Sequence, residues 1–482
     1  MNETIPRHQT ALNRDKISRP IRLALESNLI QDKSTILDFG CGKGHDVFFL
    51  KDKGFKCVGW DPFYSPDTKR KKSDIVNLGY VINVIEEYEE RIEVLKKAWA
   101  YTKKVLIVSA RHNLEQKDEG LIHFKDGYLT RRKTFQKYYQ QNELKDWINE
   151  TLNIGSLAAA PGIFYVFRDL EFKQSFIASS YRRRLSAPRQ RISDILFEKN
   201  KELLEPLINF LSDRGRLPDI LELNNAQEIN KEFGSLKKAF RVIRHATGSE
   251  QWDEIKKERT QDLLIYLALV RFDGRPTFGK LSNDLKLDVR SFCSTYKLSC
   301  ELADELLFSA GNQDNIDEAC RESNIGKLTP TALYIHSSAL PSLPVILRIY
   351  EGCAQGYVGK IEKGNVIKLN RHKPQVSYLW YPDFEKDPHP ALQGSIIVPL
   401  NNPKTKYRDY TNSENPFILH RKEEFILEDN PLKEKFHKLT KQEERHGLFE
   451  NTSIIGTRNG WKQELDLRGL RLSGHRVLKI KT

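Results

Sequence analysis

Between residues 33 and 175, short apolar runs of the kind found in buried strands alternate with segments of helical periodicity. Residues 86–101 show the helical period clearly, because their apolar side chains share one face. Strands that alternate with helices pair in parallel through right-handed crossovers. The pattern therefore predicts a Rossmann-like, doubly wound α/β domain with its ligand site at the carboxyl ends of the strands. The expected strands are residues 34–39, 56–60, 73–76 and 104–109.

The rest of the chain divides into three further stretches. Residues 1–32 are a basic lead-in that ends in a short helical pattern from Ile21 to Leu29. Residues 176–328 are mostly helical in pattern. Residues 329–482 are richer in proline, aromatic and β-branched residues, which predicts a mixed α+β region.

Composition places this chain of 482 residues among globular proteins, with 39% hydrophobic and 30% charged residues. No leader pattern and no apolar run long enough to span a bilayer is found, so we expect a cytoplasmic protein without membrane contact. The net charge of +13 is compatible with a polyanionic partner. Six scattered cysteines form no C-x-x-C pair, which indicates reduced thiols and argues against a metal site.

A glycine-rich turn follows the first predicted strand and opens a helix. Its sequence, from Asp38 to Gly44, is DFGCGKG, and Asp61 ends the next strand. A carboxylate at the position of Asp61 can accept both hydroxyls of a ribose. The spacing is G-x-G-x-G, and Asp38 two positions before the first glycine would repel a pyrophosphate. The turn suits a ligand with a cationic end, such as the amino group and sulfonium of S-adenosylmethionine (SAM).

These motifs resemble those of class I SAM-dependent methyltransferases. The resemblance implies that Gly40, Gly42 and Gly44 form the backbone cradle for SAM. It further implies that Asp38 anchors the methionine end and that Asp61 binds the ribose. The alternative is a nicotinamide-binding or unliganded α/β domain.

The catalytic candidates are Asn77 and Tyr80, at the end of the strand that reads DIVNLGY. Their spacing is similar to the N-P-P-Y motif of methyltransferases that act on the amino group of adenine or cytosine. In those enzymes the Asn accepts from the exocyclic amine and the Tyr stacks on the flipped base. Here Leu78 and Gly79 replace both prolines, so Asn77 could instead line the cofactor.

Several other residues near this predicted site remain open. Candidate bases are His45, His112 and His123, although a loop histidine is more often an ordinary surface residue. Trp60 and the aromatic residues after Asp61 could stack on adenine or pack in the core.

Strings along nearly the whole chain resemble a bacterial family of DNA phosphorothioation-associated methyltransferases. This resemblance implies a role beside DNA sulfur modification, in defence against foreign DNA. DNA or another nucleic acid and the DNA sulfur-modification proteins are the partners it suggests. The strings include GWDPFYSPD (59–67), NLGYVINVIE (77–86), GKLTPTALYIHSSALP (326–341) and IKLNRHKPQVSYLWYPDF (367–384).

Basic residues outside the first domain fall into two groups. The stretch from Tyr181 to Arg191 is either a solvated face or a nucleic-acid contact. The second group mixes basic and aromatic residues and predicts a nucleic-acid surface. Its members are Lys368, Arg371, His372, Lys373, Tyr378, Trp380 and Tyr381. A further site could combine Asp387, His389, His420 and Arg421.

The sequence thus predicts a SAM-dependent methyltransferase linked to DNA phosphorothioation, acting on or with DNA. Two alternatives stay open. One is a methyltransferase for RNA or a small metabolite, which the two missing prolines favour. The other is a non-catalytic SAM sensor or DNA-binding partner.

Overall fold

The computed structural model describes residues 5–116, 120–190, 194–402 and 404–480. The chain forms two compact units. One comprises Met1–Phe172, Gln313–Leu340 and Tyr350–Thr482, and the other comprises Lys173–Asn312 and Pro341–Ile349. The predicted domain boundaries therefore stay predictions. Within the described residues, no helix is both long and apolar enough to cross a membrane.

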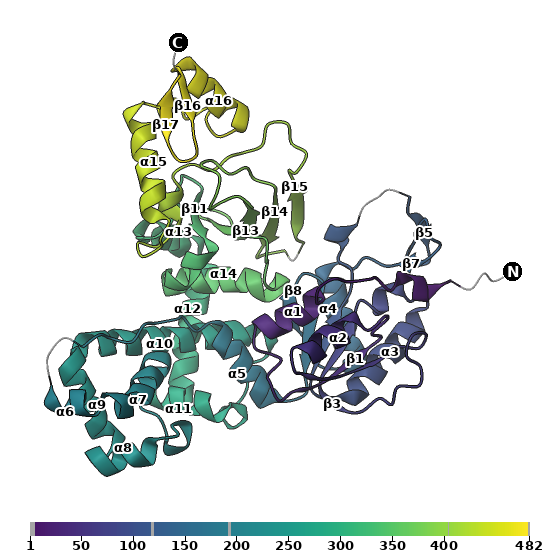
Figure 1. Cartoon of the computed structure of the whole chain (residues 1–482), viewed down its shortest axis with the longest axis horizontal. Helices are drawn as coiled ribbons and strands as arrows, with labels where there is room; N and C mark the ends of the chain where they lie inside the picture. Colours follow the sequence, from purple (N-terminus) through teal and green to yellow (C-terminus); the bar gives the residue numbers. More distant parts are fainter. Residues whose placement is uncertain (1–4, 117–119, 191–193, 403, 481–482) are drawn as a thin grey trace. The chain divides into compact units, whose positions relative to one another are not determined.

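The first sheet of unit 1 has six strands in the order β2-β1-β3-β4-β9-β8. The pairs β1–β2, β1–β3 and β3–β4 are parallel, and β9 runs antiparallel to both neighbours. This mostly parallel sheet confirms the predicted Rossmann-like fold (Figure 1). The strands are β1 (Thr35–Phe39), β2 (Lys56–Trp60), β3 (Ser73–Gly79), β4 (Thr102–Ser109), β8 (Leu157–Ala160) and β9 (Ile163–Phe167).

Helices of this domain bury one face against the sheet. In α3, Leu95 and Ala98 are fully buried and join a core with Val76 and Leu106 of the strands. The helical period of residues 86–101 thus has its expected cause, the burial of one apolar stripe. The helices are α1 (Arg19–Glu26), α2 (His45–Asp52), α3 (Tyr88–Tyr101) and α4 (Gln141–Leu152).

A three-stranded antiparallel insertion follows β4. It consists of β5 (Ile122–Phe124), β6 (Gly127–Leu129) and β7 (Phe135–Gln136). Buried Arg91 of α3 donates from Nη1 and Nη2 to the Asp126 carboxylate at 2.6 and 2.7 Å. This two-pronged pair holds the β5–β6 turn to α3 and keeps the pKa of Asp126 well below its usual range.

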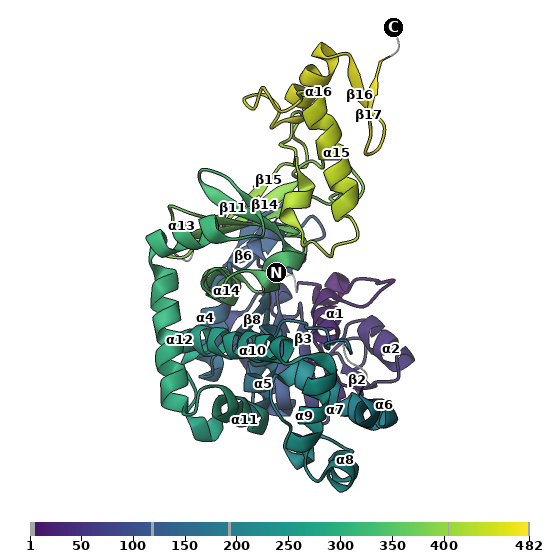
Figure 2. The same cartoon turned by 90° about the vertical axis from the view of Figure 1, so that its left-hand side faces the viewer.

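The second sheet of unit 1 is antiparallel, in the order β10-β11-β12-β13-β14-β15. Helix α15 lies beside the β16–β17 hairpin (Figures 1 and 2). The strands are β10 (Lys327–Leu328), β11 (Ala332–His336), β12 (Val366–Asn370), β13 (Gln375–Trp380), β14 (Gly394–Pro399), β15 (Lys406–Asp409), β16 (Leu470–Leu472) and β17 (Val477–Lys479). The helices are α13 (Gln313–Glu322), α14 (Val345–Val358), α15 (Lys433–Arg445) and α16 (Arg458–Leu467).

Unit 2 is helical, as its sequence pattern predicts. Leu204, Leu207 and Ile243 are fully buried in one of its cores. Its helices are α5 (Leu170–Ser180), α6 (Ile195–Lys199), α7 (Lys201–Arg214), α8 (Ala226–Phe233), α9 (Leu236–Thr247), α10 (Ser249–Leu269), α11 (Asn283–Phe292) and α12 (Tyr296–Gly311). Helix α5 begins in unit 1, and the first five residues of α14 belong to unit 2.

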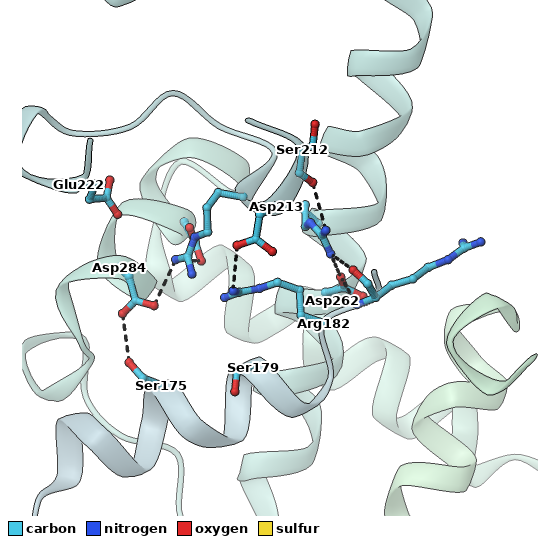
Figure 3. Close-up of polar contacts among 12 residues, drawn as sticks. Ser175, Ser179, Arg182, Ser212, Asp213, Glu222, Asp262 and Asp284 are labelled. Atoms are coloured by element: carbon cyan, nitrogen blue, oxygen red, sulfur yellow. Dashed lines mark hydrogen bonds and ion pairs between the residues drawn. The ribbon is translucent and has the colours of Figure 1, made fainter. Parts of the chain in front are cut away.

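The arginine stretch that begins at Tyr181 is built into unit 2. Arg182 reaches the Asp213 carboxylate at 3.6 Å (Figure 3). Arg183 pairs with Glu258 at 3.2 Å. Burial, with help from nearby Arg214, lowers the pKa of Arg182. These two arginines are therefore part of an internal network rather than a freely solvated face, and Arg191 lies outside the described residues.

Asp262 is the centre of this network. Its carboxylate accepts from Arg259 Nη1 at 2.9 Å, from Arg348 Nη2 at 2.7 Å and from the Arg183 backbone amide at 3.1 Å. The three side chains are each less than a tenth exposed. A buried charge needs such complete pairing, because burial without it is costly.

The predicted basic and aromatic surface of residues 368–381 is wrong for three of its members. Arg371 is buried and donates to Asp317 at 2.6 Å. Tyr378 is buried and its hydroxyl donates to Glu351 at 2.7 Å. Tyr381 is also buried. A sequence of basic and aromatic residues has the same pattern whether its side chains face solvent or are buried against neighbouring elements of a sheet.

His389 and His420 do meet, as the proposed further site requires, but in a closed interior. Their rings lie 4.5 Å apart, and His389 Nε2 lies 2.9 Å from Glu443 Oε1. Burial lowers the pKa of both histidines to about 3. Over the described ranges, no group of His, Cys, Asp and Glu is arranged to hold a metal ion.

Candidate functional site

A cavity of about 1290 Å³ opens at the carboxyl ends of β1, β2 and β3. Every predicted site residue except Gly44 lines this cavity. Gly44 instead caps the N-terminus of α2. The structure thus brings together, from three strands, the residues Asp38, Gly40, Gly42, Asp61, Asn77 and Tyr80.

The glycine turn needs backbone angles that other residues rarely adopt. Gly40, Gly42 and Gly44 have φ values of 84°, 52° and 77°. A Cβ on Gly40 would lie 2.4 Å from Val81 Cγ2, so the turn has no room for a side chain there. The Gly40 and Cys41 amides donate to the Trp60 carbonyl, which ties the turn to the end of β2.

Asp38 and Asn77 are joined inside the cavity wall. Asn77 Nδ2 donates to Asp38 Oδ1 at 2.8 Å. Burial, with the nearby negative charge of Asp46, raises the pKa of Asp38 to about 7. The Oδ1 atoms of Asn77 and Asn83 are buried and lack a hydrogen-bond donor among the described residues. A ligand with a cation near Asp38 and a donor near these oxygens would complete the wall.

Backbone amides hold the Asp61 carboxylate at the end of β2. Oδ2 accepts from the Gly42 amide at 2.9 Å, and Oδ1 accepts from the amides of Phe63 and Tyr64 at 2.9 Å. These bonds fix the carboxylate beside the glycine turn. Oδ2 keeps a second lone pair with which to accept from a ribose hydroxyl, whereas Oδ1 already accepts two hydrogen bonds.

Residues 5–14, which we call the N-terminal cover, line the same cavity. The His8 ring stacks on Phe63 with centroids 4.2 Å apart. The Tyr64 hydroxyl donates to the His8 carbonyl at 3.0 Å. A Cβ on Gly42 would lie 3.1 Å from the Ala11 Cβ, so the cover passes directly over the glycine turn.

Ion pairs and hydrogen bonds fasten this cover at both ends. Arg7 donates to Glu86 at 2.8 Å and to both oxygens of Glu90 at 2.6 and 2.7 Å. Lys43 donates to Asn13 at 2.8 Å. The sequence predicts this segment only as a basic lead-in, because the partners of its side chains lie far along the chain and leave no local pattern.

Tyr80 occupies a strained position at the end of β3. Its φ is 60°, uncommon for a residue with a side chain, and its amide donates to the Ser109 carbonyl at 2.9 Å. Guanidinium carbons of Arg14 and Arg111 lie 5.8 and 5.6 Å from the ring centroid. Strain of this kind is concentrated at functional sites.

The three candidate histidines differ in burial and in whether they line the cavity. His112 is buried, and its Nδ1 accepts from the Leu114 amide at 3.2 Å, capping a short helix. Burial lowers its pKa to about 4. His123 lies in β5 and does not line the cavity, whereas His45 does. Trp60 also lines the cavity, with Arg70 4.4 Å from its ring centroid.

Comparison with known families gives one match. Residues 7–151 match the family described as Methyltransferase domain. The match begins within the N-terminal cover and ends in α4, so it contains the glycine turn and both catalytic candidates. No curated protein matches the chain significantly.

Similar solved structures cover about a third of the chain. A SAM-dependent methyltransferase from Methanosarcina mazei is 17% identical, with 32% of this chain and 97% of that chain covered and a TM-score of 0.24. The CcbJ methyltransferase from Streptomyces caelestis is 12% identical, with 33% and 93% covered and a TM-score of 0.24. A 1,6-didemethyltoxoflavin-N1-methyltransferase from Burkholderia thailandensis, with bound S-adenosylhomocysteine, is 11% identical, with 34% and 76% covered and a TM-score of 0.22. Because these identities and TM-scores are low, the cofactor is inferred from the family match and from the residues of the site.

The residues present fit S-adenosylmethionine. Within the described residues, buried Asp38 forms no ion pair, and the amino group and sulfonium of the cofactor would supply a cation. The Asp61 carboxylate, positioned after β2 by the Gly42 amide, could accept a hydrogen bond from the ribose. The cavity is larger than the ~300–1,000 Å³ typical of a small-molecule site, which leaves room for a second ligand. S-adenosylmethionine is accordingly the cofactor of this domain.

Proposed function

We propose that this SAM-dependent methyltransferase acts on a nucleic acid, at an amino group of a base, in connection with bacterial DNA phosphorothioation. The observation that carries the proposal is the pair of buried acceptor oxygens, Asn77 Oδ1 and Asn83 Oδ1, in the wall beside Tyr80. A base amine has the donors that these oxygens lack. The link to phosphorothioation rests on the sequence resemblance alone.

The protein's contribution to such a reaction is alignment. The cofactor supplies an activated methyl group with its own leaving group, so the enzyme needs mainly to position the acceptor. Asn77, held by its bond to Asp38, would accept from the amine. The Tyr80 ring would stack on the base, and the insertion from β5 to β7 lines the remaining wall.

The test combines purified protein with radiolabelled SAM and four acceptors: plain DNA, phosphorothioated DNA, tRNA and a metabolite extract. We expect label in nucleic acid, lost in Asn77→Ala. Label only in the small-molecule fraction would contradict the proposal. An Asp253→Asn variant, altered on the surface of unit 2, is the matched control and retains full activity.

A small-metabolite acceptor is the second candidate. Leu78 and Gly79 stand where base-specific enzymes have two prolines, and they provide a less rigid turn. The metabolite arm of the same experiment tests it. A SAM sensor without activity would bind SAM in calorimetry and leave every acceptor unlabelled.

A further inference from the structure

We propose that Arg14 and Arg111 form a phosphate-binding subsite beside Tyr80, so that the methyl acceptor of this enzyme carries a phosphate. This inference rests on the proposed function, which it extends from a base amine to a nucleotide unit. It concerns the part of the cavity that the cofactor residues leave open.

The geometry brings two arginines from distant segments to one ring. Arg14 belongs to the N-terminal cover, and Arg111 follows β4. Both side chains line the cavity, with guanidinium carbons 5.8 and 5.6 Å from the Tyr80 centroid. Guanidinium groups beside an aromatic ring can bind the phosphate of a nucleotide whose base contacts that ring.

The position of Arg14 is fixed from both sides. Before it, Asn13 Oδ1 accepts from Lys43 at 2.8 Å. After it, the Ser18 amide donates to Asp46 at 2.7 Å. Arg14 is therefore carried by a segment anchored to the glycine turn and α2, as a binding residue must be.

The charge of Arg14 is not neutralised within the protein. Over the ranges that the structure describes, Arg14 has no carboxylate within ion-pair distance, and its ring contact is with Tyr80. Arg111 pairs with Glu115 at 2.6 Å, and Arg14 is close enough to Asp38 to counteract part of the rise in its pKa. A phosphate would supply the missing negative charge, and the guanidinium fork matches its oxygens.

The cavity wall carries both acidic and basic side chains. Asp38 and Asp61 lie at the glycine turn, the end that fits the cationic cofactor. Glu90, another lining acid, is already paired with Arg7. The cavity wall near the insertion adds Arg131 and Arg132. One cavity thus supplies carboxylates that fit the cationic cofactor and arginines that fit a phosphate on the acceptor.

The test measures binding to the SAM-saturated full chain with three probes: adenosine, adenosine monophosphate and a short single-stranded oligonucleotide. We expect the two phosphate-bearing probes to bind more tightly than adenosine. Arg14→Gln and Arg111→Gln should each weaken their binding about tenfold and leave adenosine unchanged. Tighter binding of the oligonucleotide than of adenosine monophosphate would identify a nucleic-acid strand as the source of the phosphate. Equal affinities for these two probes would identify a free nucleotide as the source.

Controls separate this inference from the proposed function. Arg244→Gln removes a surface arginine of unit 2 and should match the wild type. Arg14→Lys keeps the charge and should recover part of the lost affinity. Equal binding of adenosine and its monophosphate, or variants that bind the probes normally, would overturn the subsite. So would an Arg14→Gln variant that loses SAM itself, because Arg14 would then hold the cofactor. Failure of the wild type to bind SAM would instead overturn the proposed function.

Discussion

Asn77 Nδ2 and Asp38 Oδ1 are 2.8 Å apart, and this hydrogen bond joins the carboxyl ends of β3 and β1. It connects the predicted anchor for the cofactor to a catalytic candidate. Because the Asn77 amide nitrogen is used in this way, its oxygen is left as the group available to an acceptor. Cofactor and acceptor binding should therefore influence each other through this pair.

The pKa of Asp38 makes SAM binding depend on pH. Burial raises this pKa to about 7, so the carboxyl is mostly neutral at lower pH and charged at higher pH. A cationic ligand binds the charged form. We expect the Kd for SAM, measured by calorimetry, to fall roughly five- to tenfold between about pH 6 and pH 7.5.

The variant Asp38→Asn supplies the control for this pH dependence. It keeps the shape of the side chain and removes the titrating group. Its Kd should be higher than that of the wild type and nearly constant with pH. A wild-type profile as flat as that of the variant would show that Asp38 does not contact the cation.

Two glycine substitutions separate backbone strain from the contact with the N-terminal cover. Gly42→Ala and Gly44→Ala both place a side chain at positive φ, which costs on the order of 1 kcal/mol. The new Cβ at Gly42 also meets Ala11 at 3.1 Å, whereas that at Gly44 meets open space. We expect similar thermal destabilisation, with SAM affinity reduced clearly more in Gly42→Ala. Equal affinities would mean that the cover is not needed for cofactor binding.

Asp262→Asn should destabilise unit 2 strongly. Its carboxylate satisfies Arg259 and Arg348, both buried, and removing one partner of a buried pair costs about 3–5 kcal/mol. Chemical denaturation followed by circular dichroism measures the loss. Asp253→Asn, in the exposed pair with Arg244, should cost less than about 1 kcal/mol. A small loss in both would show that the Asp262 network is not a stabilising feature.

Glu443 predicts a stability difference at alkaline pH. Burial, with nearby Glu423, raises its folded-state pKa to about 8, above its usual value of 4.5. Its contribution to stability is present below pH 4.5 and is lost as the pH rises through 8. Glu443→Gln mimics the neutral form, so it should nearly match the wild type near pH 5 and be more stable, by roughly 4–5 kcal/mol, near pH 9.

Thermal melting across this pH range checks the prediction. The matched control is Glu434→Gln, an exposed glutamate on the same helix, whose difference from the wild type should stay small and constant. A constant difference for Glu443→Gln as well would show that Glu443 is ionised at neutral pH.

The sequence was most informative where a local pattern has one physical cause. Positive φ at Gly40 and Gly42 requires glycine, and Asp38 near the end of β1 and Asp61 after β2 lie beside this turn by the geometry of a parallel sheet. The fold of the first domain and the cofactor were therefore predictable. The identity of each binding residue remains a prediction for the experiments above.

Features that depend on distant contacts could not be read in this way. The Arg7 pair with Glu86 and Glu90 joins segments separated by three strands, and no local sequence pattern near Arg7 indicates it. Arg371 and Tyr378 illustrate the opposite case. Their basic and aromatic sequence predicts a surface, but both side chains are buried. Their partners, Asp317 and Glu351, come from two helices elsewhere in the chain.

The Arg7 attachment has a consequence for the kinetics of turnover. This side chain is about a third exposed, so dissolved ions weaken its attraction to Glu86 and Glu90. The spent cofactor would leave its site past the N-terminal cover, which this attraction helps to hold in place. Ionic strength should therefore shorten the residence time of the product, and an enzyme limited by release would work faster in more concentrated salt.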